Sequence, residues 1–274
     1  MSEQVSYQFE ETSKDEILWR YLRFEHFFAL IETNLMHFTY PMYFEDPFEG
    51  CYSKKTIEAL EKYEGREGEE FRRNIYRANN EIPRAVTCWH RQQVESWLMW
   101  KHYGADRGIA VVTKSDKLLS SIGNSCERSP MLGNVRYIDL DEEEIQPLNI
   151  LNNIMHKQRE FSAECETRLV IDPLCVGDRE HYLTNAGILL PNNPSDWIER
   201  IVLSPELSFL EKALTKYLDS KGFSINVSTS RLASGPYQLY EVFQANLVVK
   251  KEDVSKVRLP MSIFIETEDS CSQE

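Results

Sequence analysis

The sequence lacks the short motifs that mark several common nucleotide-binding and hydrolytic folds. It contains no G-x-x-x-x-G-K-[ST], no G-x-G-x-x-G after an expected strand, no G-x-S-x-G and no H-E-x-x-H. These absences argue against phosphate-loop NTPases, Rossmann dehydrogenases, α/β-hydrolases and zincins.

Long apolar runs and an excess of basic charge are also missing. No window of the 274 residues has the apolar length needed to cross a bilayer, and the first residues, MSEQVSYQFEETSKDE, lack a signal-peptide pattern. The formal net charge of -13 disfavours an extended non-specific nucleic-acid coat and binding to anionic membranes. We therefore expect a soluble, cytoplasmic protein without a membrane partner.

Cysteine and histidine are few and badly spaced for metal binding. The six cysteines form no C-x-x-C pair, and the six histidines do not pair at ligand spacing. We expect reduced thiols and no His-rich metal site. An oxygen-ligand site for magnesium or manganese remains an alternative if four carboxylates converge, namely Asp46, Glu49, Glu164 and Glu166.

The residues that are present predict an α/β (mixed α+β) fold, a single compact domain around a central mixed sheet. Period-two runs such as ILWRYL, AVTCWH, GIAVVT and IERIVL indicate strands, and RFEHFFALIETN and ELSFLEKALTKYLDSKG have helical spacing. A further helix is expected around LNILNNIMHKQREF. We predict a flexible N-terminus at 1–14, one domain at 15–262 and a disordered tail at 263–274. The domain includes a helical insertion at about 54–80 and a C-terminal βαβ unit at about 198–230.

The stretch FSAECETRLVI places Glu164, Glu166 and Arg168 at alternate positions. If it is extended, the three side chains share one face and the two carboxylates lie side by side, with Arg168 lowering the pKa of one of them. Such a pair suits acid–base or charge-stabilising chemistry. The alternative is a charged strand face on which Arg168 pairs with glutamates for structural reasons.

Three aromatic residues mark the segment SWLMWKHYG. Trp97, Trp100 and Tyr103 lie at three-residue spacing, so a regular helix would put them on one face, either as a binding surface or as core. Arg20 is expected either to bind a ligand or to pair with Asp46 or Glu49. Those two acids also suit the closing of the turn around Pro47 and Gly50.

Taken in order, LWRYL, DPFEG, SWLMWKHYGADRGIAV, VRYID, EFSAECETRLVI and ERIVLSP resemble an uncharacterised prokaryotic family, the domain of unknown function 2971 group. The likeness runs from Leu18 to about Ser230. It supplies no activity.

A more distant likeness does supply one. The succession of ILWRYLRFEHFFALIETNLMHF, the aromatic strand TCWH, the aromatic helix WLMWKHYG and E-x-E resembles the mono-ADP-ribosyltransferase fold. That resemblance implies Glu166 as catalytic carboxylate with Glu164 as its partner. Asp46 and Glu49 are expected as supporting acids. The resemblance also implies Arg20 on the ribose or phosphate side of NAD, Trp89 and His90 at the second motif and Tyr103 as a residue that stacks on nicotinamide. Further candidates for NAD binding are Tyr21, Trp97, Trp100 and Arg168. TCWH departs from the second motif of those enzymes, which is Ser-Thr-Ser or Tyr.

The functional expectation is an ADP-ribosyltransferase-like enzyme that uses NAD as substrate without a metal, transferring ADP-ribose to an unknown acceptor or hydrolysing NAD. A role as an antiviral defence protein or toxin-type effector fits such chemistry. Two alternatives stay open: a non-catalytic nucleotide- or protein-binding module, and a carboxylate-metal hydrolase or nuclease. A chelator separates the metal enzyme from the other two.

Overall fold

We describe the fold from a computed structural model. It covers residues 8–80, 84–105, 107–149, 151–177 and 182–234. The described residues up to Ala233 belong to one compact unit. This unit combines helices with a large mixed sheet, as the sequence predicts; the predicted domain end at 262 and the tail from 263 lie outside the described residues.

The helices and strands occur in the following bounds. The helices are α1 (Phe24–Thr33), α2 (Lys54–Glu61), α3 (Gly65–Asn80), α4 (Trp97–Met99), α5 (Ser115–Ser125), α6 (Pro194–Trp197) and α7 (Glu211–Ser220). The strands are β1 (Glu10–Glu11), β2 (Ile17–Arg23), β3 (Leu35–Thr39), β4 (Ala85–Arg91), β5 (Gly108–Lys114), β6 (Met131–Asn134), β7 (Arg136–Ile138), β8 (His156–Gln158), β9 (Glu166–Ile171), β10 (Leu183–Thr184), β11 (Gly187–Pro191), β12 (Arg200–Leu203) and β13 (Asn226–Thr229).

The main sheet has eleven strands among the described residues, in the order β1-β6-β9-β4-β2-β5-β12-β13, with β3, β11 and β10 branching from β4. Its pairs are antiparallel except β12 and β13, which are parallel and joined through α7. This is the C-terminal βαβ unit that the sequence predicts. Strand β1 lies within residues 1–14, the segment predicted to be flexible, and it pairs with β6.

Two strands of the sheet diverge near its centre. Strand β2 pairs with β4 only at Leu18 and Trp19, and beyond that point β4 meets β3 at Val86. The three strands on which the sequence predicted functional residues, β2, β4 and β9, are therefore neighbours in the sheet, in the order β9-β4-β2.

The two faces of the sheet differ in what covers them. One face carries the largest apolar cluster, into which α1 contributes Phe27 and Ile31 and α7 contributes Leu214 and Leu218. Two smaller clusters lie apart from it, one around Trp100 and one around Met155. Residues opposite each other across the ladder share a face, so the register puts Glu166 and His90 on the side of Trp19.

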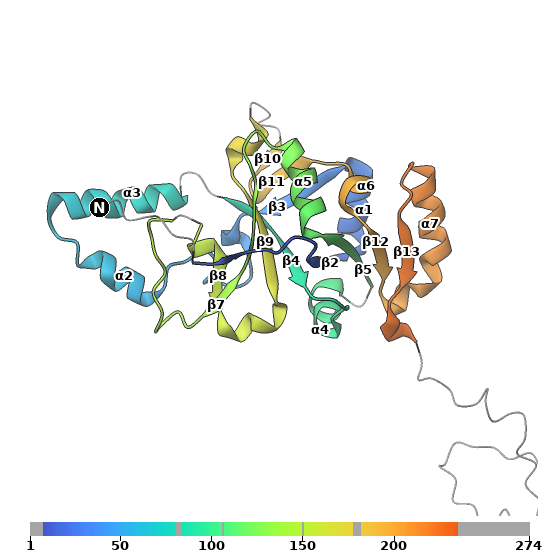
Figure 1. The fold of residues 1–274 in the computed structure, drawn as a ribbon, viewed down its shortest axis with the longest axis horizontal. Coiled ribbons are helices and arrows are strands. Elements are labelled where there is room, and N and C mark those ends of the chain that lie inside the picture. The colour runs from blue at the N-terminus through green and yellow to red at the C-terminus, as the bar shows by residue number, and fades with distance from the viewer. Residues whose placement is uncertain (1–7, 81–83, 106, 150, 178–181, 235–274) are drawn as a thin grey trace, which may run out of the picture. The chain divides into compact units, whose positions relative to one another are not determined.

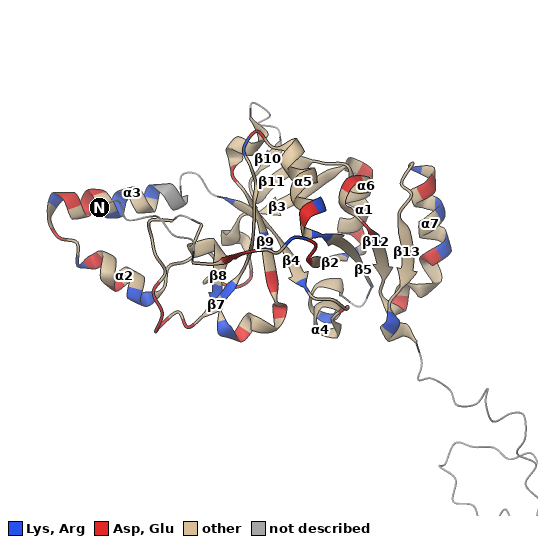
Figure 2. Ribbon diagram, in the orientation of Figure 1, with Lys and Arg blue, Asp and Glu red and all other residues tan. Residues whose placement is uncertain are grey.

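Helices α2 and α3 form the predicted insertion and lie beyond β7 and β8, which pair as a separate two-stranded sheet, whereas α7 lies beside β13 (Figure 1). Both groups of helices carry Lys, Arg, Asp and Glu in alternation along their surfaces (Figure 2). None of the helices in the described ranges combines the length and hydropathy that crossing a membrane requires.

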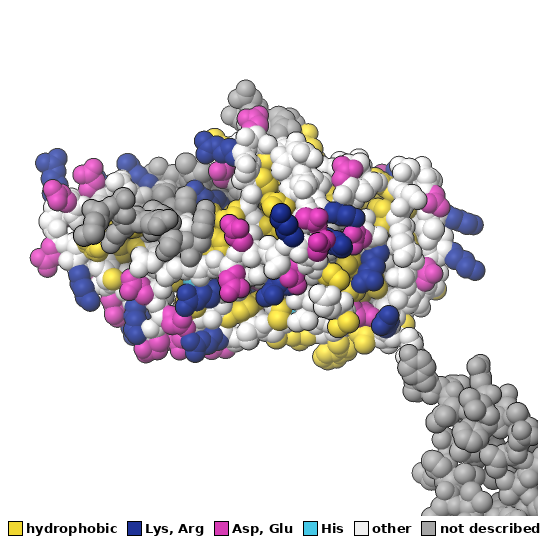
Figure 3. All heavy atoms as spheres, viewed as in Figure 1, with side chains coloured by type: hydrophobic (Ala, Val, Ile, Leu, Met, Phe, Trp, Pro, Cys, Tyr) yellow, Lys and Arg dark blue, Asp and Glu magenta, His cyan; other side chains and the backbone are white. Residues whose placement is uncertain are grey.

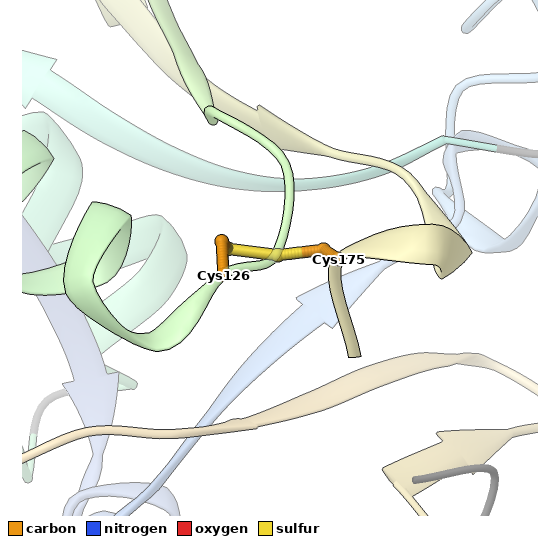
Figure 4. The surroundings of a disulfide bond; sticks show 2 residues. All are labelled: Cys126 and Cys175. Atoms are coloured by element: carbon orange, nitrogen blue, oxygen red, sulfur yellow. A yellow bond between two sulfur atoms is a disulfide. The ribbon is translucent and has the colours of Figure 1, made fainter. Parts of the chain in front are cut away.

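Two expectations about this unit are wrong. The segment LNILNNIMHKQREF is not one helix: it forms turns, a 3-10 turn at Asn153–Met155 and strand β8. The expectation of reduced thiols also fails for two cysteines, because Cys126 and Cys175 are joined by a disulfide (Figure 4). Spacing alone did not reveal this pair, since its partners are 49 residues apart in the chain.

Candidate functional site

Strand β9 supplies Glu166 and Arg168 but not Glu164. All six residues of β9 are buried, whereas Glu164 ends the preceding 3-10 segment, Arg159–Glu164. Cys165 between them has a left-handed backbone, with φ of 42°, and this turns the chain before the strand begins. The predicted extended E-x-E is thus wrong for Glu164.

The two glutamates nevertheless meet, through a lysine that the sequence reasoning did not select. The Nζ atom of Lys157 lies 2.7 Å from Glu164 Oε2, 3.7 Å from Glu166 Oε2 and 3.1 Å from Glu49 Oε1. Lys157 comes from β8, a strand that the helical interpretation of its segment concealed.

Arg168 supplies the second cation at this point. Its side chain is fully buried, and its Nε donates to Glu166 Oε1 at 2.8 Å while Nη2 donates to Glu49 Oε1 at 2.9 Å. Its Nη1 donates to the Ile154 carbonyl at 2.6 Å. We call Glu49, Lys157, Glu164, Glu166 and Arg168 the charged cluster. Three carboxylates against two cations leave it with one formal negative charge.

Glu166 and Lys157 are held in their ionised forms by their neighbours in the cluster. Burial raises the pKa of Glu166, but the charge and hydrogen bonds of Arg168, helped by Lys157, outweigh burial and leave the pKa below its usual value. Burial by itself lowers the pKa of Lys157, but the carboxylates of Glu166 and Glu49 raise it by more. The pKa of Lys157 is therefore above its usual value. Nearby Cys88 stays a protonated thiol, because burial and then Glu166 raise its pKa.

Tyrosine and histidine side chains border the cluster. The Tyr103 hydroxyl donates to Glu164 Oε1 at 2.9 Å, and the Glu166 backbone N–H donates to the Tyr137 hydroxyl at 2.8 Å. His90 lies 2.6 Å from the Glu164 carbonyl through Nδ1; a carbonyl only accepts, so Nδ1 carries the proton. Burial lowers the pKa of His90, which leaves a neutral ring with a buried Nε2 that has no partner among the described residues.

The aromatic segment does not form one face. Helix α4 ends at Met99 and continues as a π-helix over Trp100–Gly104. A π turn holds more residues than an α turn, so three-residue spacing no longer superimposes side chains. Trp97 is 63% exposed and Tyr103 43% exposed, while Trp100 is 4% exposed and packs edge-on to Tyr21 with ring centroids 4.8 Å apart.

Arg20 does not join the charged cluster. It alternates with Trp19 and Tyr21 along β2, so the register sends it to the opposite face from Glu166. Its guanidinium donates to the His37 carbonyl at 3.3 Å and lies 5.9 Å from the Trp89 ring centroid. No described carboxylate forms an ion pair with it, so the expected pairing with Asp46 or Glu49 is wrong. Burial lowers its pKa to about 10.

Two more predicted residues lie outside the cluster. Trp89 is buried in the main apolar cluster and packs edge-on to Trp197 at 5.7 Å between centroids. Asp46 accepts from the Phe48 N–H at 2.9 Å and closes the turn, as one interpretation of the sequence expected. Its neighbour Glu49 instead reaches the cluster from the same loop.

Comparison with known families gives one match. Residues 99–169 match the family described as "Protein of unknown function (DUF2971)". The match begins within α4 and ends within β9, so it includes Tyr103, Lys157, Glu164, Glu166 and Arg168 but not Glu49. No curated protein and no solved structure matches the chain, so the distant resemblance to ADP-ribosyltransferases gains no support from the comparisons.

Proposed function

We propose that the protein binds NAD on the sheet face that carries the charged cluster and cleaves the nicotinamide–ribose bond, with Glu164 as the carboxylate beside the ribose. The observation that carries this proposal is the difference in exposure among the three carboxylates. The side chain of Glu164 is 16% exposed, against 6% for Glu166 and 1% for Glu49. Glu164 alone combines contact with solvent and contact with the cluster.

The chemistry suits a carboxylate fixed in this way. When the C–N bond breaks, its electron pair leaves with nicotinamide and the ribose develops oxocarbenium character. A preorganised anion beside the ribose stabilises that charge, and the net negative cluster adds to the effect. Water or an acceptor nucleophile then bonds to the ribose carbon and loses its proton to Glu164 or solvent.

The proposal assigns different roles to the two glutamates. The sequence analysis favours Glu166 as the catalytic carboxylate, but both of its oxygens accept from Arg168. We assign Glu166 to positioning, since it fixes Arg168 and contacts Lys157, which in turn holds Glu164. Tyr103, which donates to Glu164 and is partly exposed, remains the candidate to stack on nicotinamide.

Two observations support a nucleotide-binding face on this side of the sheet. The strands β2, β4 and β9 are neighbours, which brings Tyr21, His90 and Glu166 to one face. On the same side of the sheet, His90 has a neutral, buried acceptor nitrogen that no described residue partners. The carboxylate-metal alternative is weakened, because Glu49, Glu164 and Glu166 already bind Lys157 and Arg168 and Asp46 closes a turn.

One observation favours the binding-module alternative. Two cavities of the described residues, of about 190 and 210 Å³, are lined by residues outside the charged cluster. A binding module would recognise its ligand without turning it over. Such a protein should bind NAD or another nucleotide and release no nicotinamide.

The test is a nicotinamide-release assay on the wild type, Glu164→Gln, Glu166→Gln and the control Glu142→Gln, an exposed glutamate paired with Lys55. We expect Glu164→Gln to remain folded and to lose activity by about 10²- to 10⁴-fold. Glu166→Gln should chiefly lower stability, and the control should behave as wild type. Wild-type protein that releases no nicotinamide, or Glu164→Gln protein with full activity, would overturn the proposal.

A further inference from the structure

A groove borders the aromatic segment, and Tyr103 is not among the residues that line it. Its volume is about 210 Å³, and we call it the Trp97 groove. It is lined by Trp97, Trp100, Lys101, Ser204, Pro205, Glu206 and Leu232. Hydrophobic side chains gather at the lower edge of the face in Figure 3, in the region where Figure 1 draws α4. No residue of the charged cluster lines the groove.

The wall of the groove contains a large aromatic side chain that the fold does not bury. Trp97 is 63% exposed, although its helical neighbour Trp100 is 4% exposed. The π-helix that follows explains the difference, because it rotates Trp100 into the apolar cluster of Trp19 and Val112 and leaves Trp97 outside. An exposed indole beside a groove offers a flat surface on which another ring can stack.

Ser204, one of the residues that line the groove, has a polar group without a partner among the described residues. Ser204 is 1% exposed, and its hydroxyl makes no hydrogen bond with any described residue. Burying a hydroxyl without a partner is unfavourable, and native proteins rarely leave one so. A ligand in the groove would satisfy it. Ser204 is held in place by its own backbone N–H, which donates to the Gly108 carbonyl at 3.1 Å.

We propose that the Trp97 groove binds the purine base of a nucleotide, stacked on Trp97 and hydrogen-bonded to the Ser204 hydroxyl. A purine is flat, has donors and acceptors on its edge and is small enough for a groove of this volume. The hydroxyl both donates and accepts, so it can serve either kind of edge group. Lys101 and Glu206, of opposite charge, also line the groove and give it no net charge that would repel a nucleotide.

The groove and the charged cluster are joined by a row of packed rings. Trp100 lines the groove and packs edge-on to Tyr21, whose ring lies edge-on to His90 at 6.1 Å between centroids. His90 in turn contacts the Glu164 carbonyl. The inference extends the proposed function by naming a second point of ligand contact, yet it is tested with ligands that contain no nicotinamide.

The test is titration of the full chain with adenosine and AMP, followed by calorimetry and tryptophan fluorescence. We expect binding to the wild type, a loss of about tenfold or more in affinity for Trp97→Ala and a loss of a few-fold for Ser204→Ala. The matched control is Phe209→Ala, which removes an exposed aromatic side chain from the segment Pro205–Leu210 without touching the groove.

Thermal unfolding of each variant shows whether it is folded. Ser204→Ala should keep or raise its midpoint, because it removes an unsatisfied hydroxyl, so a loss of binding by this variant cannot come from unfolding. No adenosine binding by the wild type, or equal binding by Trp97→Ala, would overturn the inference.

The Glu164→Gln variant separates this inference from the proposed function. If Glu164→Gln binds adenosine and Trp97→Ala does not, the groove is supported, whether or not the wild type releases nicotinamide. Nicotinamide release by a protein whose adenosine binding is insensitive to Trp97→Ala supports the function and overturns the groove.

Discussion

The charged cluster and the Trp97 groove lie at opposite ends of one short helical segment, and they treat their polar groups in opposite ways. In the cluster the protein pairs nearly every charge itself: Glu166 and Glu49 bind Arg168, and Glu164 binds Lys157. In the groove it leaves Trp97 exposed, and the Ser204 hydroxyl has no hydrogen-bond partner in the part of the chain that the structure describes. Buried ions need partners of opposite charge within the fold, because an unpaired buried charge costs much free energy. An exposed ring and one hydroxyl cost less without a partner, so they can remain available to a ligand.

The largest expected effect comes from breaking the compensation in the cluster. Arg168→Met should lower the free energy of unfolding by about 3–5 kcal/mol, because Glu49 and Glu166 would remain buried without their cation. Chemical denaturation at neutral pH measures this. Exposed Arg136, which pairs with Glu143, provides the control: Arg136→Met should cost at most about 1 kcal/mol. Equal losses in the two variants would contradict a special role for burial.

The second effect is the pH dependence of stability. The pKa of Glu166 is lower in the folded protein than in the unfolded chain, where it is about 4.3. Its contribution to the free energy of unfolding is therefore complete above that unfolded pKa and is lost as the pH falls through the folded pKa. The neutral, buried His90 adds an earlier loss below about pH 6.5, since its folded pKa is also lowered. Denaturation across pH 3–8 should show both, and the Arg168→Met deficit should shrink toward acid.

A smaller effect is expected at the hydrogen bond that Tyr103 donates to Glu164 of the charged cluster. Tyr103→Phe removes the hydroxyl that donates to Glu164 and should cost about 1 kcal/mol, a modest value because Tyr103 is partly exposed. Tyr217→Phe is the matched control, since Tyr217 donates to Glu32 on an exposed surface. Urea denaturation of both variants measures the difference. A loss at Tyr103 no larger than at Tyr217 would show that Glu164 does not depend on this bond.

The smallest effect is expected in the groove. Trp97→Ala should change the free energy of unfolding by no more than about 0.5 kcal/mol, because the side chain is largely exposed in the protein. The same denaturation assay applies. A large loss would mean that Trp97 serves packing after all and would remove the contrast between the two regions.

Much of the sheet could be predicted from the sequence, because alternation along β2, β4, β5 and β12 is a local signal. The shared face of Glu166 and Arg168 followed from the same period. The partners of these residues could not be predicted in this way. Arg168 binds Glu49 from 119 positions away, and nothing near either residue specifies that approach.

Two local features also escaped prediction, for different physical reasons. The left-handed backbone at Cys165 occurs at a residue type that rarely adopts it, so a continuous strand from Glu164 was the natural expectation. The π-helix after Met99 inserts extra residues into one turn, and Gly104 at its end is equally typical of the C-terminus of an ordinary α-helix, so it does not reveal the change. Both features decide which side chains point together, and the site therefore differs from its sequence pattern.

The disulfide between Cys126 and Cys175 has a consequence for the charged cluster. Lys157, Glu164, Glu166 and Arg168 all lie within the segment that it closes, and only Glu49 lies outside. A closed loop of this length restricts the unfolded chain by about 4 kcal/mol in the chain-entropy model. The cohesion of the charged cluster is thereby coupled to thiol–disulfide exchange: where reductants are abundant, these four residues and Glu49 must hold together through non-covalent contacts alone.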